Sequence, residues 1–163
     1  MLKVSGKFIA EHWRNGKKIN EYEFKNGVTD EGINKLLDVM FHGVAAIATW
    51  YIGLIDDYGY SALAAADTMS SHAGWAECTE YDEAARQEWV EDAASGLSIT
   101  NTTLATFTIN ATTTLKGMFL SSGSAKSGTT GTLWCTGLFA SGDVSVVDDD
   151  VIKVKYTVTI GAA

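Results

Sequence analysis

The chain of 163 residues contains no proline. Average usage of about 5% would predict roughly eight prolines in a chain of this length. Backbone bends must therefore be made by glycine, asparagine and aspartate, which accept turn conformations by other means. The 16 glycines are spread along the chain and separate short segments that alternate apolar and polar residues. This pattern is typical of short β-strands joined by turns.

Cysteine and histidine are scarce, and neither residue type forms a recognisable cluster. Cys78 and Cys135 are isolated, so we expect two thiols that pack as small apolar side chains, not a disulfide or a metal site. The three histidines, His12, His42 and His72, lack the spacing of a metal site. No segment matches a phosphate-binding loop or a nucleophile elbow. We therefore predict no catalytic residues, no metal and no cofactor, and a protein that is not an enzyme.

The sequence also lacks a long apolar run. The longest, from Val44 to Ile55, is interrupted by Thr49 and Gly53 and falls short of the ~20 residues that a membrane-spanning helix needs. The first residues show no apolar core of a secretory signal. These features predict a protein that is made in the cytoplasm and has no membrane partner.

Basic charge is in deficit overall, but it is unevenly distributed. The net charge of -8 argues against a nucleic-acid partner, because such domains carry a basic patch. Residues 1–27 nevertheless hold six basic and three acidic side chains, whereas residues 56–92 hold ten acidic side chains and the single base Arg86. Either these are two ordinary solvated faces, or the basic segment attracts an acidic neighbour.

The first 27 residues have the pattern of a β-hairpin. Two alternating segments, 7–13 and 19–24, flank Asn15 and Gly16. Asn-Gly at this position favours a type I′ turn, because both central residues must adopt positive φ. We therefore expect an N-terminal hairpin arm.

One helix is predicted over residues 29–42. Thr29 or Asp30 can cap its start, and Gly43 can end it in the left-handed conformation. Apolar residues recur at helical spacing and form one stripe. These are Ile33, Leu36, Leu37, Met40 and Phe41. We expect this stripe to lie against a sheet.

The remainder, residues 48–163, is rich in strand patterns. A segment at 49–55 is apolar on both faces, and the last segment, 152–160, alternates throughout. The connection 56–76 is long enough to predict a short helical turn within it, and the acidic residues 148–150 suggest a solvated turn. Regularly spaced short strands indicate a mainly β, jelly-roll-like β-sandwich. We expect one domain over 1–163, with the hairpin arm and one helix packed on the sheet.

Several stretches of the sequence resemble a group of small virion structural proteins of tailed bacteriophages. The resemblance covers most of the chain and is carried by structural residues. These stretches are 26–34 (NGVTDEGIN), 49–56 (TWYIGLID), 67–77 (DTMSSHAGWAE), 80–86 (EYDEAAR), 107–111 (FTINA), 128–133 (GTTGTL) and 154–159 (VKYTVT). Such proteins are β-rich and either decorate the capsid or sit in the tail, so the resemblance implies a protein that works by protein–protein contact.

The resemblance and the charge distribution together suggest a capsid decoration or cement protein. Its expected partners are the major capsid protein and further copies of itself in a homotrimer, on the exterior of the capsid. Candidate docking residues lie on the basic hairpin and on one apolar segment. They are Lys7, Arg14, Lys17, Lys18 and Trp134. The alternative is a tail or fibre-associated adaptor, or a glycan-binding module that uses an exposed tryptophan.

Overall fold

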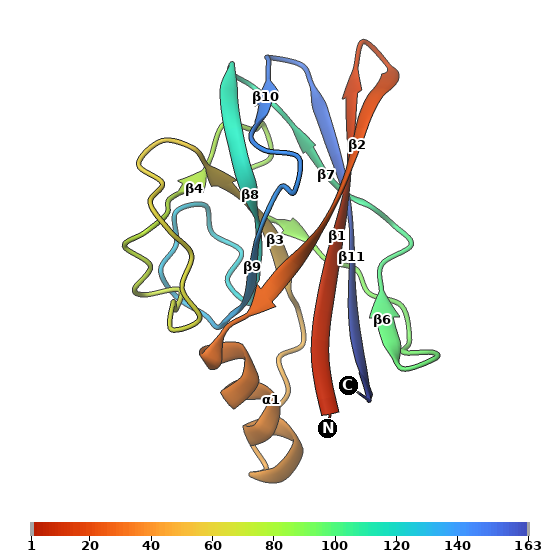
Figure 1. The fold of residues 1–163 in the computed structure, drawn as a ribbon, viewed down its shortest axis with the longest axis vertical. Helices are drawn as coiled ribbons and strands as arrows, with labels where there is room; N and C mark the ends of the chain where they lie inside the picture. The colour runs from red at the N-terminus through yellow and green to blue at the C-terminus, as the bar shows by residue number, and fades with distance from the viewer. Residues whose placement is uncertain (1, 163) are drawn as a thin grey trace.

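The computed structural model describes residues 2–162 and is mainly β, with eleven strands and one helix in this range (Figure 1). The elements are β1 (Leu2–Arg14), β2 (Lys17–Val28), α1 (Asp30–Phe41), β3 (Tyr51–Asp56), β4 (Glu77–Cys78), β5 (Gln87–Glu88), β6 (Ser98–Thr100), β7 (Ala105–Thr108), β8 (Thr113–Ser121), β9 (Leu133–Leu138), β10 (Val144–Val146) and β11 (Val151–Ala162). The prediction of a β-rich fold with a single helix is confirmed.

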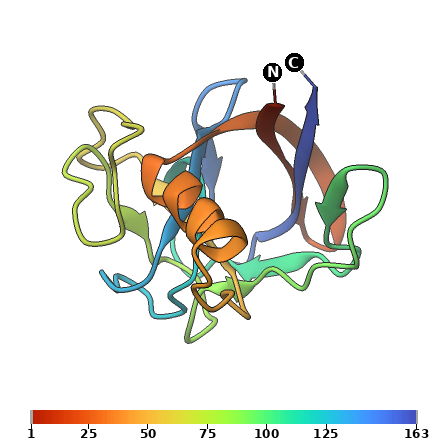
Figure 2. The same cartoon turned by 90° about the horizontal axis from the view of Figure 1, so that it is seen from below.

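All strand pairs are antiparallel, and the main path through the sheet is β4-β3-β8-β9-β2-β1-β11-β6. β2 pairs with β1 along almost its whole length but with β9 only at Gly27 and Val28. The path therefore bends at β2 and curls into two facing layers, as the view along the strands shows (Figure 2). The first and last long strands, β1 and β11, are neighbours over almost their whole length, which places these two strands in one layer.

Irregular backbone joins the β4 end of the path to β7, a strand off the main path that pairs with β11. The N–H of Asp82 donates to the carbonyl of Thr108 at 2.8 Å, and the N–H of Asn110 donates to the carbonyl of Glu80 at 3.2 Å. These bonds connect the chain after β4 to the end of β7. These two bonds occupy backbone groups along this side of the fold, where an exposed sheet edge would otherwise invite pairing.

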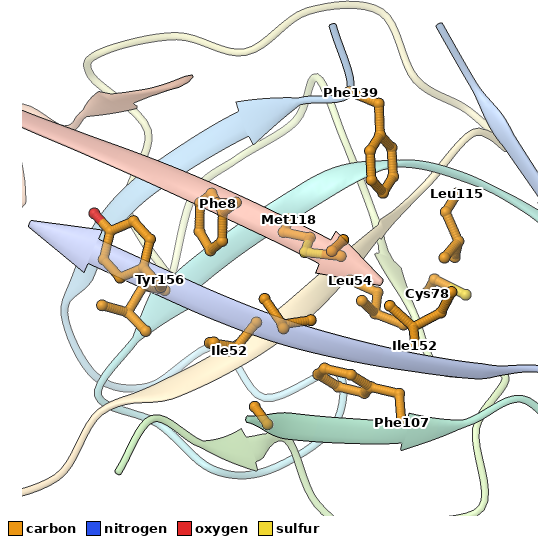
Figure 3. Packing of buried hydrophobic residues seen from close by; sticks show 14 of the residues in the cluster. Phe8, Ile52, Leu54, Cys78, Phe107, Leu115, Met118, Phe139, Ile152 and Tyr156 are labelled. Atoms are coloured by element: carbon orange, nitrogen blue, oxygen red, sulfur yellow. The ribbon is translucent and has the colours of Figure 1, made fainter. Parts of the chain in front are cut away.

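The main core lies between the two layers. Side chains from β1, β3, β7, β8 and β11 meet there, as Figure 3 shows for Phe8, Leu54, Phe107, Met118 and Ile152, all of which are at most 1% exposed. A smaller cluster forms on the outer side of the layer that contains β8 and β9. There, Met69 and Trp75 cover Phe119 and Leu133. The connection 57–76 supplies this cover through turns, and the helical turn predicted there is absent. The burial of its apolar residues holds it in place without regular structure.

The hairpin between β1 and β2 forms as predicted. Asn15 and Gly16 have φ values of 50° and 72°, so both central residues take the left-handed conformation that a type I′ turn requires. The paired strands are longer than their alternating segments indicated, because β1 and β2 remain in register as far as Gly6 and Asn26. The hairpin is therefore part of the sheet as well as an arm.

The helix begins and ends where the sequence predicts. The Thr29 hydroxyl accepts the N–H of Gly32 at 3.0 Å, and Gly43 follows the last turn with a φ of 70°. The first turn is closely packed on the sheet, since a Cβ atom on Gly32 would lie 2.7 Å from the carbonyl oxygen of Trp134. This close contact directs α1 past the end of the sheet (Figure 1).

Most of the apolar stripe of α1 consequently faces solvent, contrary to the expectation that it lies against the sheet. Leu37 is 49% exposed, Met40 is 64% exposed and Phe41 is 81% exposed. Apolar spacing identifies the apolar face of a helix, but it does not identify the surface that this face contacts. Docking of the helix through its first turn therefore could not be inferred from the sequence. The exposure of this stripe leads to a first prediction about the stability of the fold.

Replacing Phe41 with serine is expected to change the free energy of unfolding by less than about 0.5 kcal/mol. If the side chain were packed on the sheet, as the periodicity suggests, truncation would cost about 3 to 5 kcal/mol. Urea denaturation followed by tryptophan fluorescence distinguishes these values. Phe107→Ser is a suitable control, because Phe107 is 0% exposed. A loss above about 2 kcal/mol in Phe41→Ser would mean that the helix docks along its stripe.

Candidate interaction surface

One face of the molecule collects most of its basic side chains. Of the 12 Lys and Arg residues, eight lie on β1, β2 and β11, and these three strands carry only three of the 20 Asp and Glu residues. The basic residues are Lys3, Lys7, Arg14, Lys17, Lys18, Lys25, Lys153 and Lys155, and the acidic ones are Glu11, Glu21 and Glu23. The remaining strands, helix and loops hold 17 acidic and four basic residues. The strongly acidic chain therefore concentrates its basic residues on β1, β2 and β11. We call the surface formed by these three strands the basic face.

The alternation of strand side chains creates this face. Phe8, Ala10 and His12 point into the core and are buried, so the intervening residues of β1 point outward. The adjacent strands β2 and β11 repeat this alternation in register. Lysine at outward positions on three neighbouring strands is thereby brought into one layer, although β11 lies more than 120 residues from β2 in the chain.

Ion pairs neutralise part of the basic face. Lys7 lies 3.3 Å from Glu23, and Lys18 lies 2.8 Å from Glu21 and 3.5 Å from Glu11. The pKa of Lys18 is raised, first by its hydrogen bond to Glu21. Pairs of this kind on an exposed surface stabilise a fold by about 0 to 1 kcal/mol.

Three further lysines on the basic face carry uncompensated charge. Lys3, Lys17 and Lys25 are exposed and make no ion pair within residues 2–162. A fourth side chain, Lys153, lies over the ring of Trp13 at 4.5 Å from its centroid. Uncompensated charge on the basic face is thus concentrated at exposed β1 and β2 positions.

The structure separates the candidate docking residues that the sequence suggested. Lys17 and Lys18 lie at the tip of the hairpin, and Lys7 lies nearer its base, opposite Lys25. Trp134 is not on the surface: it is 8% exposed, and its indole N–H donates to the Tyr156 hydroxyl at 3.0 Å. It borders an apolar cavity of about 280 Å³ between α1 and the sheet. Trp134 is placed to hold the helix against the sheet.

Arg14 is the partly exposed member of a charge cluster around buried Asp150. Its guanidinium donates to both carboxylate oxygens of Asp150 at 2.7 Å, and the Nε2 atom of His12 lies 2.7 Å from the same carboxylate. Asp150 also accepts the N–H of Val147 at 2.9 Å. These contacts hold the pKa of Asp150 well below its ordinary value, and the hydrogen bond from Arg14 is the largest cause.

The acidic turn before β11 therefore differs from its prediction. Asp148 and Asp149 are exposed, as expected for a solvated turn, but Asp150 is fully buried. Nothing in the sequence marked Asp150 as the buried member, because its partners His12 and Arg14 are 138 and 136 residues away. The cluster fastens the hairpin tip to the turn that starts β11.

A second buried charge pair joins the loop between β8 and β9 to β4. Arg86 makes two hydrogen bonds to the carboxylate of Glu77, at 2.9 and 2.7 Å. Its other bonds are to the Ser121 hydroxyl and to the carbonyls of Gly123 and Gly128. The five N–H donors of the guanidinium are thus all used. Arg86 acts as a structural link and has no donor left for a ligand.

The cysteines are buried thiols, and metal ligands do not cluster within the described residues. Cys78 and Cys135 are free and fully buried, and burial raises the pKa of each thiol to about 12. Among residues 2–162, no three His, Cys, Asp or Glu side chains lie together as metal ligands. The helix in this range is too short and too polar to cross a membrane.

Comparisons with known proteins add no assignment. No model of a protein family matches the chain, and no curated protein matches it. The functional argument consequently rests on the residues and on their arrangement.

Proposed function

We propose that this chain is a bacteriophage virion structural protein that decorates the capsid and docks through its basic face. The observation that carries the proposal is the separation of charge between β1, β2 and β11 and the rest of the molecule. The sequence resemblance described above supports the virion setting. In this role the chain works by contact and not by catalysis, on the exterior of a capsid that it stabilises.

A basic face on an acidic molecule selects both a partner and an orientation. Complementary charge accelerates encounter with an acidic surface, while the 17 acidic residues elsewhere oppose docking in other orientations. The partner that fits is an acidic surface of the major capsid protein. The same separation also favours contact between the basic face of one copy and the acidic side of another, which suits the proposed homotrimer, since head-to-tail contacts that close form rings.

The alternative role, a tail or fibre-associated adaptor or glycan-binding module, gains less support. A glycan site of the expected kind requires an exposed tryptophan. All five tryptophans are instead buried or half-buried: Trp13, Trp50, Trp75, Trp89 and Trp134. The charge arrangement is equally usable on a tail protein, so the experiment below includes tails as a separate target.

The test is co-sedimentation of the purified chain with capsids and, separately, with tails of its phage. We expect the wild-type chain to bind capsids, and the triple variant Lys3→Glu, Lys17→Glu, Lys25→Glu to bind about tenfold or more weakly. The matched control replaces the same three lysines with arginine and should retain binding. These lysines are exposed and unpaired within the described range, so the fold should be unaffected.

Three outcomes would contradict parts of this proposal. Equal binding by the charge-reversed triple variant would remove the basic face as the docking surface. Binding to tails and not to capsids would favour the alternative role. A monomer in native mass spectrometry, both free and when released from capsids, would exclude the homotrimer.

A further inference from the structure

The apolar cavity between α1 and the sheet has the character of a ligand site. α1 crosses one end of the two layers (Figure 2), and the cavity of about 280 Å³ lies at this end. Aliphatic side chains of α1, β6, β8 and β11 form much of its wall. They are Leu36, Val39, Ile99, Leu120, Val158 and Ile160. Because β8 and β11 belong to opposite layers, the cavity continues the space that the main core fills.

Three of the five tryptophans line the same cavity: Trp50, Trp89 and Trp134. The indole N–H of Trp89 donates to the Asn101 side chain and to the Tyr156 carbonyl, each at 3.0 Å. The Trp134 indole N–H donates to the Tyr156 hydroxyl, also at 3.0 Å. The polar atoms of these two indoles are used within the protein. The Trp50 and Trp134 rings lie edge to face, 6.1 Å apart at 65°, a geometry that favours a further aromatic ring beside them.

The charge around the cavity favours an uncharged ligand. Lys35 is the only ionisable side chain among the lining residues. Glu31 and Asp38 lie four residues before it and three residues after it on α1, which makes them its neighbours on the helix surface. An adjacent groove gathers both carboxylates and Asp30 around the same lysine. A bound anion would therefore give up its hydration without meeting net positive charge, and an apolar wall penalises any charged group.

We propose that this cavity binds a neutral aromatic molecule of about two fused rings. An engineered apolar cavity of about 150 Å³ stays dry and binds benzene, and the volume here is nearly twice as large. Ligand sites are typically concave and lined by apolar and aromatic side chains, and the mouths of β-barrels are a common place for them. The inference does not depend on the proposed function, because the cavity and the basic face are formed by different side chains.

The test is titration of the wild-type chain with naphthalene, followed by NMR of the tryptophan indole N–H groups. We expect the signals of Trp50, Trp89 and Trp134 to shift, because these rings line the cavity. Trp13 and Trp75 lie outside it and serve as internal controls whose signals stay in place. Naphthoate has the same ring system with a carboxylate, and it should bind about tenfold or more weakly.

Two variants of α1 locate the bound molecule. Val39 is half-buried and lines the cavity, so Val39→Phe puts a larger side chain into the space. We expect this variant to bind naphthalene about tenfold or more weakly than wild type. Leu37→Phe is the matched control, because Leu37 is on the same helix, is 49% exposed and does not line the cavity. It should bind within about threefold of wild type.

Four results would overturn this assignment. Naphthalene that leaves the three cavity tryptophans unshifted would mean that the cavity is not a ligand site. Equal affinity for naphthoate would mean that the site does not select a neutral molecule. Undiminished binding by a folded Val39→Phe variant would place the ligand elsewhere. A dimer in native mass spectrometry that Val39→Phe dissociates would mean that a second copy fills the cavity. None of these measurements uses capsids, so a failure of the proposed function leaves the ligand site standing.

Discussion

Replacing Arg86 with methionine is expected to lower the free energy of unfolding by about 3 to 5 kcal/mol, because it leaves the buried carboxylate of Glu77 without its partner. Arg86 is 3% exposed, and the side chain of Glu77 is 4% exposed. Methionine retains most of the aliphatic volume, so the loss reports the charge and the hydrogen bonds. The guanidinium also lies over the Phe119 ring, 5.0 Å from its centroid, and that contact is lost as well.

The two halves of this link can be separated by a double-mutant cycle. Glu77→Gln keeps an acceptor for the N–H of Ser127, which donates to Glu77 at 2.7 Å, but removes the charge. The double variant should be more stable than the sum of the single losses predicts, because neither charge is then buried alone. Urea denaturation measures all three. Lys17→Met is the exposed control and should change stability by less than about 0.5 kcal/mol. A loss below about 1 kcal/mol in Arg86→Met would show that the pair is not a principal anchor.

Features with local causes could be predicted from the sequence. The Asn15-Gly16 turn needs two adjacent residues, the cap of α1 needs Thr29 and Gly32, and the alternation of β11 is contained in one segment. In each case the physical cause lies within a few residues, so the pattern carries enough information.

Features that depend on distant partners could not be predicted. β4 and β5 are each two residues long, and each pairs with β3 over those two residues alone. The direction of α1 depends on contact between Gly32 and Trp134, about 100 residues apart. The basic face could be predicted only in part. The basic residues of β1 and β2 are neighbours in the sequence, but the contribution of β11 follows only from the strand order of the sheet.

The charge cluster at the hairpin tip gives the second large effect, and it depends on pH. Asp150→Asn is expected to cost about 2 to 3 kcal/mol near pH 7, somewhat less than a fully buried pair, because Arg14 is 40% exposed and partly screened. The folded-state pKa of Asp150 lies well below its ordinary value of 3.8. The carboxylate therefore stabilises the fold fully above the unfolded pKa, and this contribution is lost as the pH falls from about 4 through the lower folded pKa.

This sign leads to a specific experiment. Wild-type stability should fall as the pH is lowered below about 4, whereas Asp150→Asn lacks this contribution at every pH, so the difference between the two proteins should shrink. Urea denaturation at pH 7, pH 4 and pH 2.5 measures the difference directly. Asp148→Asn is the matched control, because Asp148 is exposed in the same turn, and it should follow wild type throughout. A gap between wild type and Asp150→Asn that is constant with pH would mean that the amide loses shape complementarity and not charge. The cluster would then contribute through packing of the turn against the hairpin.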